Sequence, residues 1–187
     1  PNSPWKRMAF AEALESEKRY DLAIIEYRKV IAADPTMPEA HYKLGRVMLL
    51  KSVDSKAAQD VAMEEFQKAL AVDPRDAGAT FEIGEIYRRR GQPQQAAGYF
   101  SRTIKIDPRR EEAEVALASV LISIGKQTDA APHLQAAIRL NPQDETAHFL
   151  LAQIYKARGD SAAYQTEMAL YRKYGALPPG EGAASGR

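Results

Sequence analysis

The fold of this chain is decided by a stretch that occurs four times. Residues 23–35 read AIIEYRKVIAADP, residues 62–74 read AMEEFQKALAVDP, residues 96–108 read AAGYFSRTIKIDP and residues 130–142 read AAPHLQAAIRLNP. The last three stretches follow one another at intervals of 34 residues, and the first precedes the second by 39. An interval of 34 residues accommodates one helix–turn–helix unit, so the spacing predicts a protein built from repeated helix pairs.

The same kinds of side chain recur at fixed positions of these repeats. Each stretch begins with a small residue and carries a large apolar one four positions later, in the pairs Ala23 and Tyr27, Ala62 and Phe66, Ala96 and Phe100, and Ala130 and Leu134. A second small residue recurs upstream of the last three stretches and after the fourth, as Gly45, Gly84, Ala118 and Ala152. We expect small residues where two helix axes approach closely, with Gly84 opposite Ala96, and large residues in the spaces between.

Taken together, these positions resemble the tetratricopeptide repeat family over about residues 4–174. The resemblance implies an all-α fold, a right-handed superhelical solenoid of antiparallel helix pairs. Each repeat would contribute a helix A and a helix B, and stability would come from the stacking of neighbouring repeats. We expect a repeat domain over residues 1–174 and a flexible tail over residues 175–187. The five repeats are expected approximately at residues 4–37, 38–76, 77–110, 111–144 and 145–174.

Signals for helix ends agree with this register. Asp76 and Asp144 are expected to cap the helices A of the third and fifth repeats, and Thr36-Met37-Pro38-Glu39 has the spacing of a capping box. Glycines stand where helix A has to stop and the chain has to reverse, at Gly91, Gly125 and Gly159. A left-handed backbone conformation is common at such a position, which favours glycine there.

Two repeats depart from the pattern. The second repeat is five residues longer than the others. Because Ser55 is a good N-cap, we expect a lengthened helix B that begins at Lys56 and follows a wider turn. In the fifth repeat Tyr164 fills the alanine position and no Asp-Pro follows, which predicts a terminal cap.

Composition sets limits on the class of protein. The 187 residues carry a net charge of +1, are 45% apolar and 27% charged, and include no cysteine. These values are ordinary for a soluble protein and exclude disulfides and thiolate metal sites. No apolar run is long enough to span a membrane, so we expect no membrane insertion. Cysteine usage fits the cytoplasm and the periplasm equally well, and the compartment stays open.

The chain offers little that points to catalysis or nucleic-acid binding. His41 and His148 occupy the same position of helix A three repeats apart, so they cannot share a metal ion, and His133 has no matching partner. We interpret the adjacent acidic pairs Glu64-Glu65 and Glu111-Glu112 as solvated helix faces. The basic cluster Arg88-Arg89-Arg90 lies at a helix end without interleaved aromatic residues, so we expect no nucleic acid as a partner. We therefore predict no catalytic residue, no metal, no cofactor and no enzymatic activity.

The resemblance also implies a binding surface, because helices A of such arrays line a concave groove that holds peptides or partner helices. Three rows of residues are expected to face this groove. The first row is Met8, Tyr42, Phe81, Val115 and Phe149; the second is Glu12, Arg46, Glu85, Ser119 and Gln153; the third is Glu15, Leu49, Arg88, Ile122 and Lys156. The first row is apolar in every repeat, which is typical of a surface that a partner covers.

We therefore predict a non-catalytic scaffold that binds a protein or peptide in its groove. The lysine, asparagine and arginine clamp with which related domains hold acidic chaperone tails is absent, since Met8, Glu12 and Gly78 fill corresponding positions. Three alternatives stay open. In the first, the first row of residues is buried between neighbouring helices A and binds no partner. In the second, the chain forms a homo-oligomer through a terminal helix face. In the third, the chain is a recruiting or regulatory segment of a larger enzyme.

Overall fold

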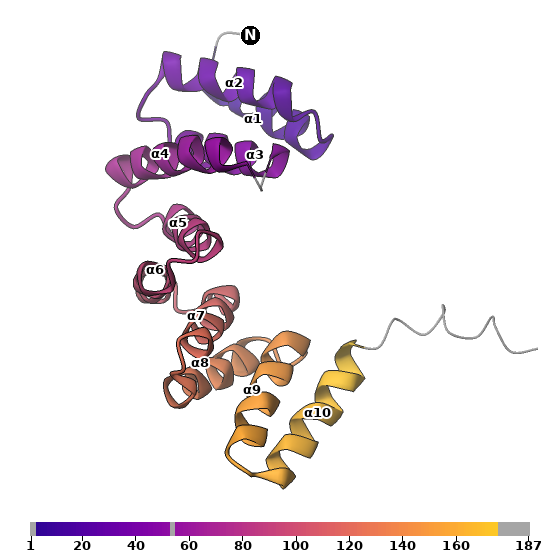
Figure 1. The fold of residues 1–187 in the computed structure, drawn as a ribbon. Helices are drawn as coiled ribbons and strands as arrows, with labels where there is room; N and C mark the ends of the chain where they lie inside the picture. The colour runs from indigo at the N-terminus through magenta and orange to yellow at the C-terminus, as the bar shows by residue number, and fades with distance from the viewer. Residues whose placement is uncertain (1–2, 53–54, 176–187) are drawn as a thin grey trace, which may run out of the picture. The chain divides into compact units, whose positions relative to one another are not determined.

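The computed structural model describes residues 3–52 and 55–175. Within these ranges the chain forms ten helices and no strand (Figure 1). The helices are α1 (Pro4–Ser16), α2 (Tyr20–Ala33), α3 (Ala40–Lys51), α4 (Lys56–Val72), α5 (Ala77–Arg89), α6 (Pro93–Ile106), α7 (Glu111–Ser123), α8 (Gln127–Leu140), α9 (Glu145–Ala157) and α10 (Ser161–Gly175). Odd-numbered helices are helices A, and each packs against the helix B that follows it. The predicted all-α fold of antiparallel helix pairs is confirmed.

The chain divides into two compact units. The first unit, Pro1–Asp107, contains α1 to α6, and the second, Pro108–Arg187, contains α7 to α10. The core of each unit lies where a helix B meets its own helix A and the next one. No helix in the described ranges has the length and apolarity that crossing a membrane requires.

The recurring small and large residues occupy the predicted core positions. The four alanines at the start of the repeated stretches are fully buried, and so are the large residues four positions later, Tyr27, Phe66, Phe100 and Leu134. Gly45 and Gly84 mark the closest approaches, because a Cβ atom on either would stand 2.7 Å from the ring of Phe66 or Phe100. Gly84 therefore lies against Phe100, one helical turn after the predicted Ala96.

The Asp-Pro or Asn-Pro dipeptide that follows α2, α4 and α8 forms a turn in which the Asp or Asn side chain bonds to the backbone. The Asp34 carboxylate accepts a hydrogen bond from the Thr36 amide (3.0 Å), and Asp73 accepts one from the Arg75 amide (2.8 Å). Asn141 repeats the contact with the Gln143 amide (3.2 Å). Asp and Asn favour such turns because the short side chain reaches the backbone two residues on.

Most of the predicted helix ends are observed. The carboxylates of Asp76 and Asp144 cap α5 and α9, and the Ser55 hydroxyl caps the lengthened α4, accepting from the Ala58 amide (3.3 Å). The capping box at Thr36 is wrong, since its hydroxyl donates to Asp34 (2.9 Å) and α3 begins only at Ala40, after Glu39 in a left-handed conformation. Left-handed backbone also occurs at the three predicted glycines, Gly91, Gly125 and Gly159.

The two departures from the repeat lie partly outside the described residues. Val53 and Asp54 of the wider turn are not described, but α4, at 17 residues, is longer than α6 and α8, which have 14 each. Of the predicted tail at 175–187 only Gly175 is described, and it ends α10. Tyr164 is half-buried, and no residue of α10 is fully buried.

We predict that Gly84→Ala destabilises the protein by about 1–3 kcal/mol, because the new methyl group overlaps the Phe100 ring and one of the helices has to move. Gly98→Ala is the matched control. A Cβ atom on Gly98 meets nothing within 4 Å, and alanine favours a helix interior over glycine by about 1 kcal/mol, so this variant gains stability. Urea unfolding of both variants measures the difference, and equal stabilities would contradict the close approach.

Candidate functional site

Two of the residues predicted to line the groove are buried in the core. Met8 lies in the buried stripe of α1 that also contains Ala11 and Leu14 at intervals of three residues, and it faces α2. Leu49 follows Gly45 by one helical turn and belongs to the cluster around Phe66. Neither side chain is available to a partner, so the prediction that Met8 and Leu49 line the groove is wrong.

Tyr42 and Phe81, the other first-row residues of the first unit, are half-buried against aromatic rings of helix B. The ring centroids of Tyr42 and Phe66 are 6.0 Å apart, and those of Phe81 and Phe100 are 5.5 Å apart. Gly78 allows the approach of α5 to Tyr42, because a Cβ atom there would lie 2.9 Å from the ring. Both residues are therefore partly exposed, while contact with a core ring holds each in position.

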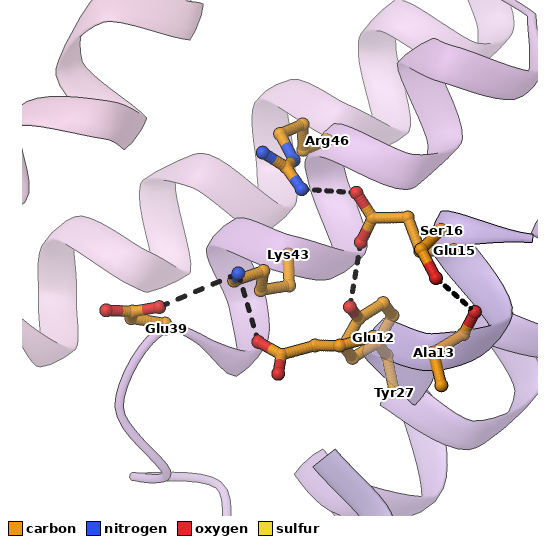
Figure 2. Close-up of polar contacts among 8 residues, drawn as sticks. All are labelled: Glu12, Ala13, Glu15, Ser16, Tyr27, Glu39, Lys43 and Arg46. Carbon is orange, nitrogen blue, oxygen red and sulfur yellow. Dashed lines mark hydrogen bonds and ion pairs between the residues drawn. The ribbon is translucent and has the colours of Figure 1, made fainter. Parts of the chain in front are cut away.

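Figure 2 shows that charged side chains of the predicted rows form hydrogen bonds and ion pairs within the first unit. The Glu15 carboxylate, which is almost buried, accepts hydrogen bonds from the Tyr27 hydroxyl (2.8 Å) and from the Arg46 guanidinium. Burial, and after it the Glu15 charge, raise the pKa of Tyr27 far above its ordinary value, so this hydroxyl remains a donor. The Lys43 ammonium lies 3.0 Å from Glu12 and 3.9 Å from Glu39. These contacts join α1, α2 and α3.

The charged residues of α5 are also paired internally. Arg88 donates two hydrogen bonds to the Glu85 carboxylate, at 2.9 and 2.7 Å, and this pairing raises the Arg88 pKa. Arg90 donates to Asp60 on α4 (2.6 Å). The basic cluster at the end of α5 is thus paired with carboxylates.

The second unit presents a different surface. Val115 and Ile122 on α7 are half-buried and pack against the core of this unit, and Ser119 between them is half-buried as well. Phe149 on α9 is 38% exposed, and its ring lies 5.2 Å from that of Tyr171 on α10. Helices α7 and α9 are in contact.

The remaining predicted residues of this surface lie on α9. Gln153 and Lys156 are exposed, and the Lys156 ammonium stands 5.9 Å from the centre of the Tyr164 ring. The second unit therefore combines an apolar strip with a polar edge.

A polar pair that our sequence analysis missed bridges helix A and helix B in four repeats. The two partners always occupy the same two positions, one turn before the small residue of helix A and three residues after the alanine position of helix B. The pairs are Arg7 with Glu26 (2.7 Å), His41 with Glu65 (2.7 Å), Glu114 with His133 (2.6 Å) and His148 with Glu167 (2.6 Å). The signal available in the sequence was a basic or histidine residue and a glutamate 19 residues apart, or 24 apart in the longer second repeat.

These pairs correct two expectations. His133 has a partner, Glu114, and Glu65 is buried rather than solvated. Burial disfavours the ionised form of Glu65, but hydrogen bonds from Lys68 and His41 hold its pKa below the ordinary value. The three histidines are therefore structural groups, and no three His, Cys, Asp or Glu side chains in the described part of the chain converge as metal ligands would.

We predict that His148→Leu destabilises the protein by about 3 kcal/mol, because it leaves the Glu167 carboxylate facing an apolar group. His148 is 2% exposed, so water cannot replace it. Gln153→Leu, an exposed change on the same helix, shifts stability by no more than about 0.5 kcal/mol. Adding Glu167→Leu to His148→Leu costs less than the two single changes summed, and additive effects in urea unfolding would refute the pairing.

Glu111, which we had placed on a solvated face, forms a carboxyl pair with Asp144, the N-cap of α9. One oxygen of Glu111 is buried without a hydrogen-bond partner. The pKa of Glu111 is raised to about 8. The largest cause is burial, followed by the hydrogen bond with Asp144, the repulsion from Asp144 and the charge of Glu112. At neutral pH Glu111 is thus mostly protonated and donates to Asp144.

A raised carboxyl pKa makes the folded state bind more protons than the unfolded state between the ordinary value of 4.5 and about 8. Stability therefore falls as pH rises through this window. We predict that Glu111→Gln flattens this slope and that the variant is more stable than the parent at pH 9, whereas Glu64→Gln, an exposed change on α4, keeps the slope. Thermal unfolding between pH 5 and 9 measures both, and an unchanged slope in Glu111→Gln would contradict the shared proton.

Comparison with known proteins identifies the class to which this arrangement belongs. Residues 60–111 match the family described as "Tetratricopeptide repeat", and residues 12–51 and 118–159 match that described as "TPR repeat". The chain belongs to the tetratricopeptide repeat family. No curated protein matches its sequence significantly.

Solved structures of the same fold are similar at low sequence identity. MamA is 21% identical with a TM-score of 0.77, and the match covers 88% of this chain and 94% of MamA. PilF of Pseudomonas aeruginosa is 19% identical with a TM-score of 0.80, covering 93% of this chain and 77% of PilF. YrrB, described as a TPR protein with an unusual peptide-binding site, is 20% identical with a TM-score of 0.71, covering 90% of this chain and 84% of YrrB. At these identities the likeness shows the fold.

Proposed function

We propose that the protein is a non-catalytic scaffold that binds a peptide or a partner helix on the exposed faces of its helices A. The observation that carries the proposal is Phe149, a large aromatic side chain that is 38% exposed yet fixed in place by Tyr171. Aromatic residues in such positions contribute most of the affinity at protein interfaces, because they bury a large apolar area with little loss of conformational freedom.

The surroundings of Phe149 support this role. Val115 and Ile122 extend the apolar strip along α7, so a bound chain would meet three apolar side chains in succession. Gln153 and Lys156 at the edge of the strip provide a hydrogen-bonding group and a positive charge. A strip of this kind suits an amphipathic helix or an extended peptide with apolar anchors and an acidic flank.

The first unit supports a second, more selective contact surface. Tyr42 and Phe81 offer ring edges between charged groups that are already paired, such as Arg46 with Glu15 and Arg88 with Glu85. Paired charges add little affinity, but they disfavour partners whose charges do not match. The tetratricopeptide repeat fold serves generally as an interaction scaffold, and YrrB, whose fold is similar, has a peptide-binding site.

We predict that Phe149→Ala weakens the binding of a selected peptide by about 1 kcal/mol or more while changing stability much less than a core substitution. Peptides are selected from a displayed random library against the full chain and then titrated calorimetrically against each variant. Leu140→Ala, which removes a leucine exposed to 40% on α8, is the control and leaves affinity unchanged.

The stability of a core variant separates binding from folding effects. Phe100→Ala, at a fully buried position, costs about 3–5 kcal/mol of folding free energy. If Phe149→Ala costs as much, Phe149 belongs to the core and the proposed surface loses its anchor. If peptides bind the parent and Phe149→Ala equally well, the binding surface lies elsewhere on the molecule.

A further inference from the structure

A cavity of about 350 Å³ opens between the first and second repeats. Its walls come from three helices of the first unit, with Ile24 and Ile25 on α2, Met48 on α3 and Ala58 on α4. Because described repeats stand on both sides of it, the cavity does not depend on where the chain begins or ends. Its volume lies at the lower end of the range, about 300–1,000 Å³, that is typical of ligand pockets.

The cavity coincides with the departure of the second repeat from the 34-residue pattern. Ser52 ends α3 and Ser55 caps α4, and both line the cavity. Met48 is also a local difference, since the third repeat carries Tyr87 at the same position, where its ring stacks on that of Tyr99 at 5.4 Å. A wider turn and a smaller side chain thus meet at the cavity.

Ile25 is an apolar side chain that the packing of the helix pair does not require. Its neighbour Ile24 belongs to the core of the first unit, whereas Ile25 does not and is 45% exposed. The residues at the same position of the other repeats are Glu64, Gly98 and Pro132. An isoleucine therefore stands at the cavity where the other repeats have no large apolar side chain.

Two of the charged residues that line the cavity pair with each other. Asp21 at the start of α2 pairs with Lys51 at the end of α3. The equivalent residues of the next repeat, Asp60 and Arg90, form the same pair at 2.6 Å. A pair that recurs between successive repeats joins helix B to the next helix A, so neither of its charges calls for a ligand.

The third charged residue of the lining, Arg28, has no such partner. It follows Ile24 by four residues and Ile25 by three, so it lies on the same face of α2. Its guanidinium forms no hydrogen bond or ion pair with any other residue that the structure describes. Because Asp21 neutralises Lys51, Arg28 leaves this apolar cavity with a net positive charge at its rim.

We propose that this cavity binds an extended segment of a partner protein in which a large aliphatic residue is followed two positions later by an acidic one. The aliphatic side chain packs beside Ile25 and Met48, and the carboxylate pairs with Arg28. In an extended segment, residues two apart point to the same side at about 7 Å, a distance that the long arginine side chain can bridge. This site goes beyond the function proposed above, which concerns helices A, and does not depend on it.

The probe is the peptide Gly-Ser-Leu-Ser-Glu-Ser-Gly, acetylated and amidated, which carries one aliphatic side chain and one charge. It is titrated into the isotopically labelled full chain, and chemical shifts report its binding even when the affinity is low. We expect saturable shifts at Ile24, Ile25, Met48 and Ala58. The same peptide with Gln in place of Glu binds with a Kd at least about fivefold weaker, because the charge-assisted contact with Arg28 is lost.

Variants of the protein test each part of the site. Arg28→Gln binds both peptides equally weakly, whereas Arg139→Gln, which removes an exposed arginine of α8, keeps the preference for Glu. Ile25→Ser weakens the binding of both peptides, and Leu140→Ser, at a similarly exposed position, does not. Melting temperatures establish that each variant is folded.

Several outcomes would overturn the proposal. One is a titration without saturable shifts at the lining residues, or with equal Kd values for the two peptides on the parent chain. Another is the loss of these shifts in Phe149→Ala, which would place the peptide on the surface around Phe149. A third is tighter binding by Asp54→Asn, since a carboxylate of the chain itself would then compete for Arg28. Tighter binding of octanoate than of the peptide would show a site for small amphiphiles instead.

Discussion

The contact between a glycine of helix A and an aromatic ring of helix B governs the first unit. Gly45 against Phe66 and Gly84 against Phe100 set how closely the two helices of a repeat approach. The same two rings support Tyr42 and Phe81 on the outer side of helix A. A change in the core contact would therefore also move the rings of Tyr42 and Phe81. In the fourth repeat Ala118 and Leu134 replace the glycine and the phenylalanine, a larger residue on one helix offset by a smaller one on the other.

A second, polar constraint acts beside this apolar one. In four repeats a charged or histidine–carboxylate pair ties helix A to helix B at one recurring position, and the third repeat has Thr80 and Tyr99 there instead. Buried pairs of this kind contribute little net stability, because desolvation offsets most of their attraction. Their effect is on register, since a helix that slips by one turn leaves a buried charge without its partner. The exchange of His and Glu between helices in the fourth repeat keeps the pair while reversing its direction.

The sequence predicts this architecture because repetition averages over weak local signals. One alanine or one Asp-Pro says little, but four copies in register locate the buried positions Ala62, Phe66 and Ala96 without further help. The site was harder to predict. Met8 and Leu49 are buried, although the residues at the equivalent positions of other repeats are partly exposed. Whether a residue at such a position is buried depends on how the neighbouring helix packs against it. The pairs of His133 with Glu114 and of Glu111 with Asp144 join residues far apart in sequence, and periodicity of apolar residues carries no information about them.

The proposed function assigns different parts in binding to the two units. On the helices A of the first unit, Glu15, Arg46, Glu85 and Arg88 are all engaged with one another or with close neighbours. A partner that competes for one of these groups has to leave another charge unpaired, so only a partner with matching charge is tolerated there. On the second unit Val115, Ile122 and Phe149 have no such internal competition, and covering them releases water at little cost. Under the proposed function, apolar contacts therefore hold a ligand and charges select it.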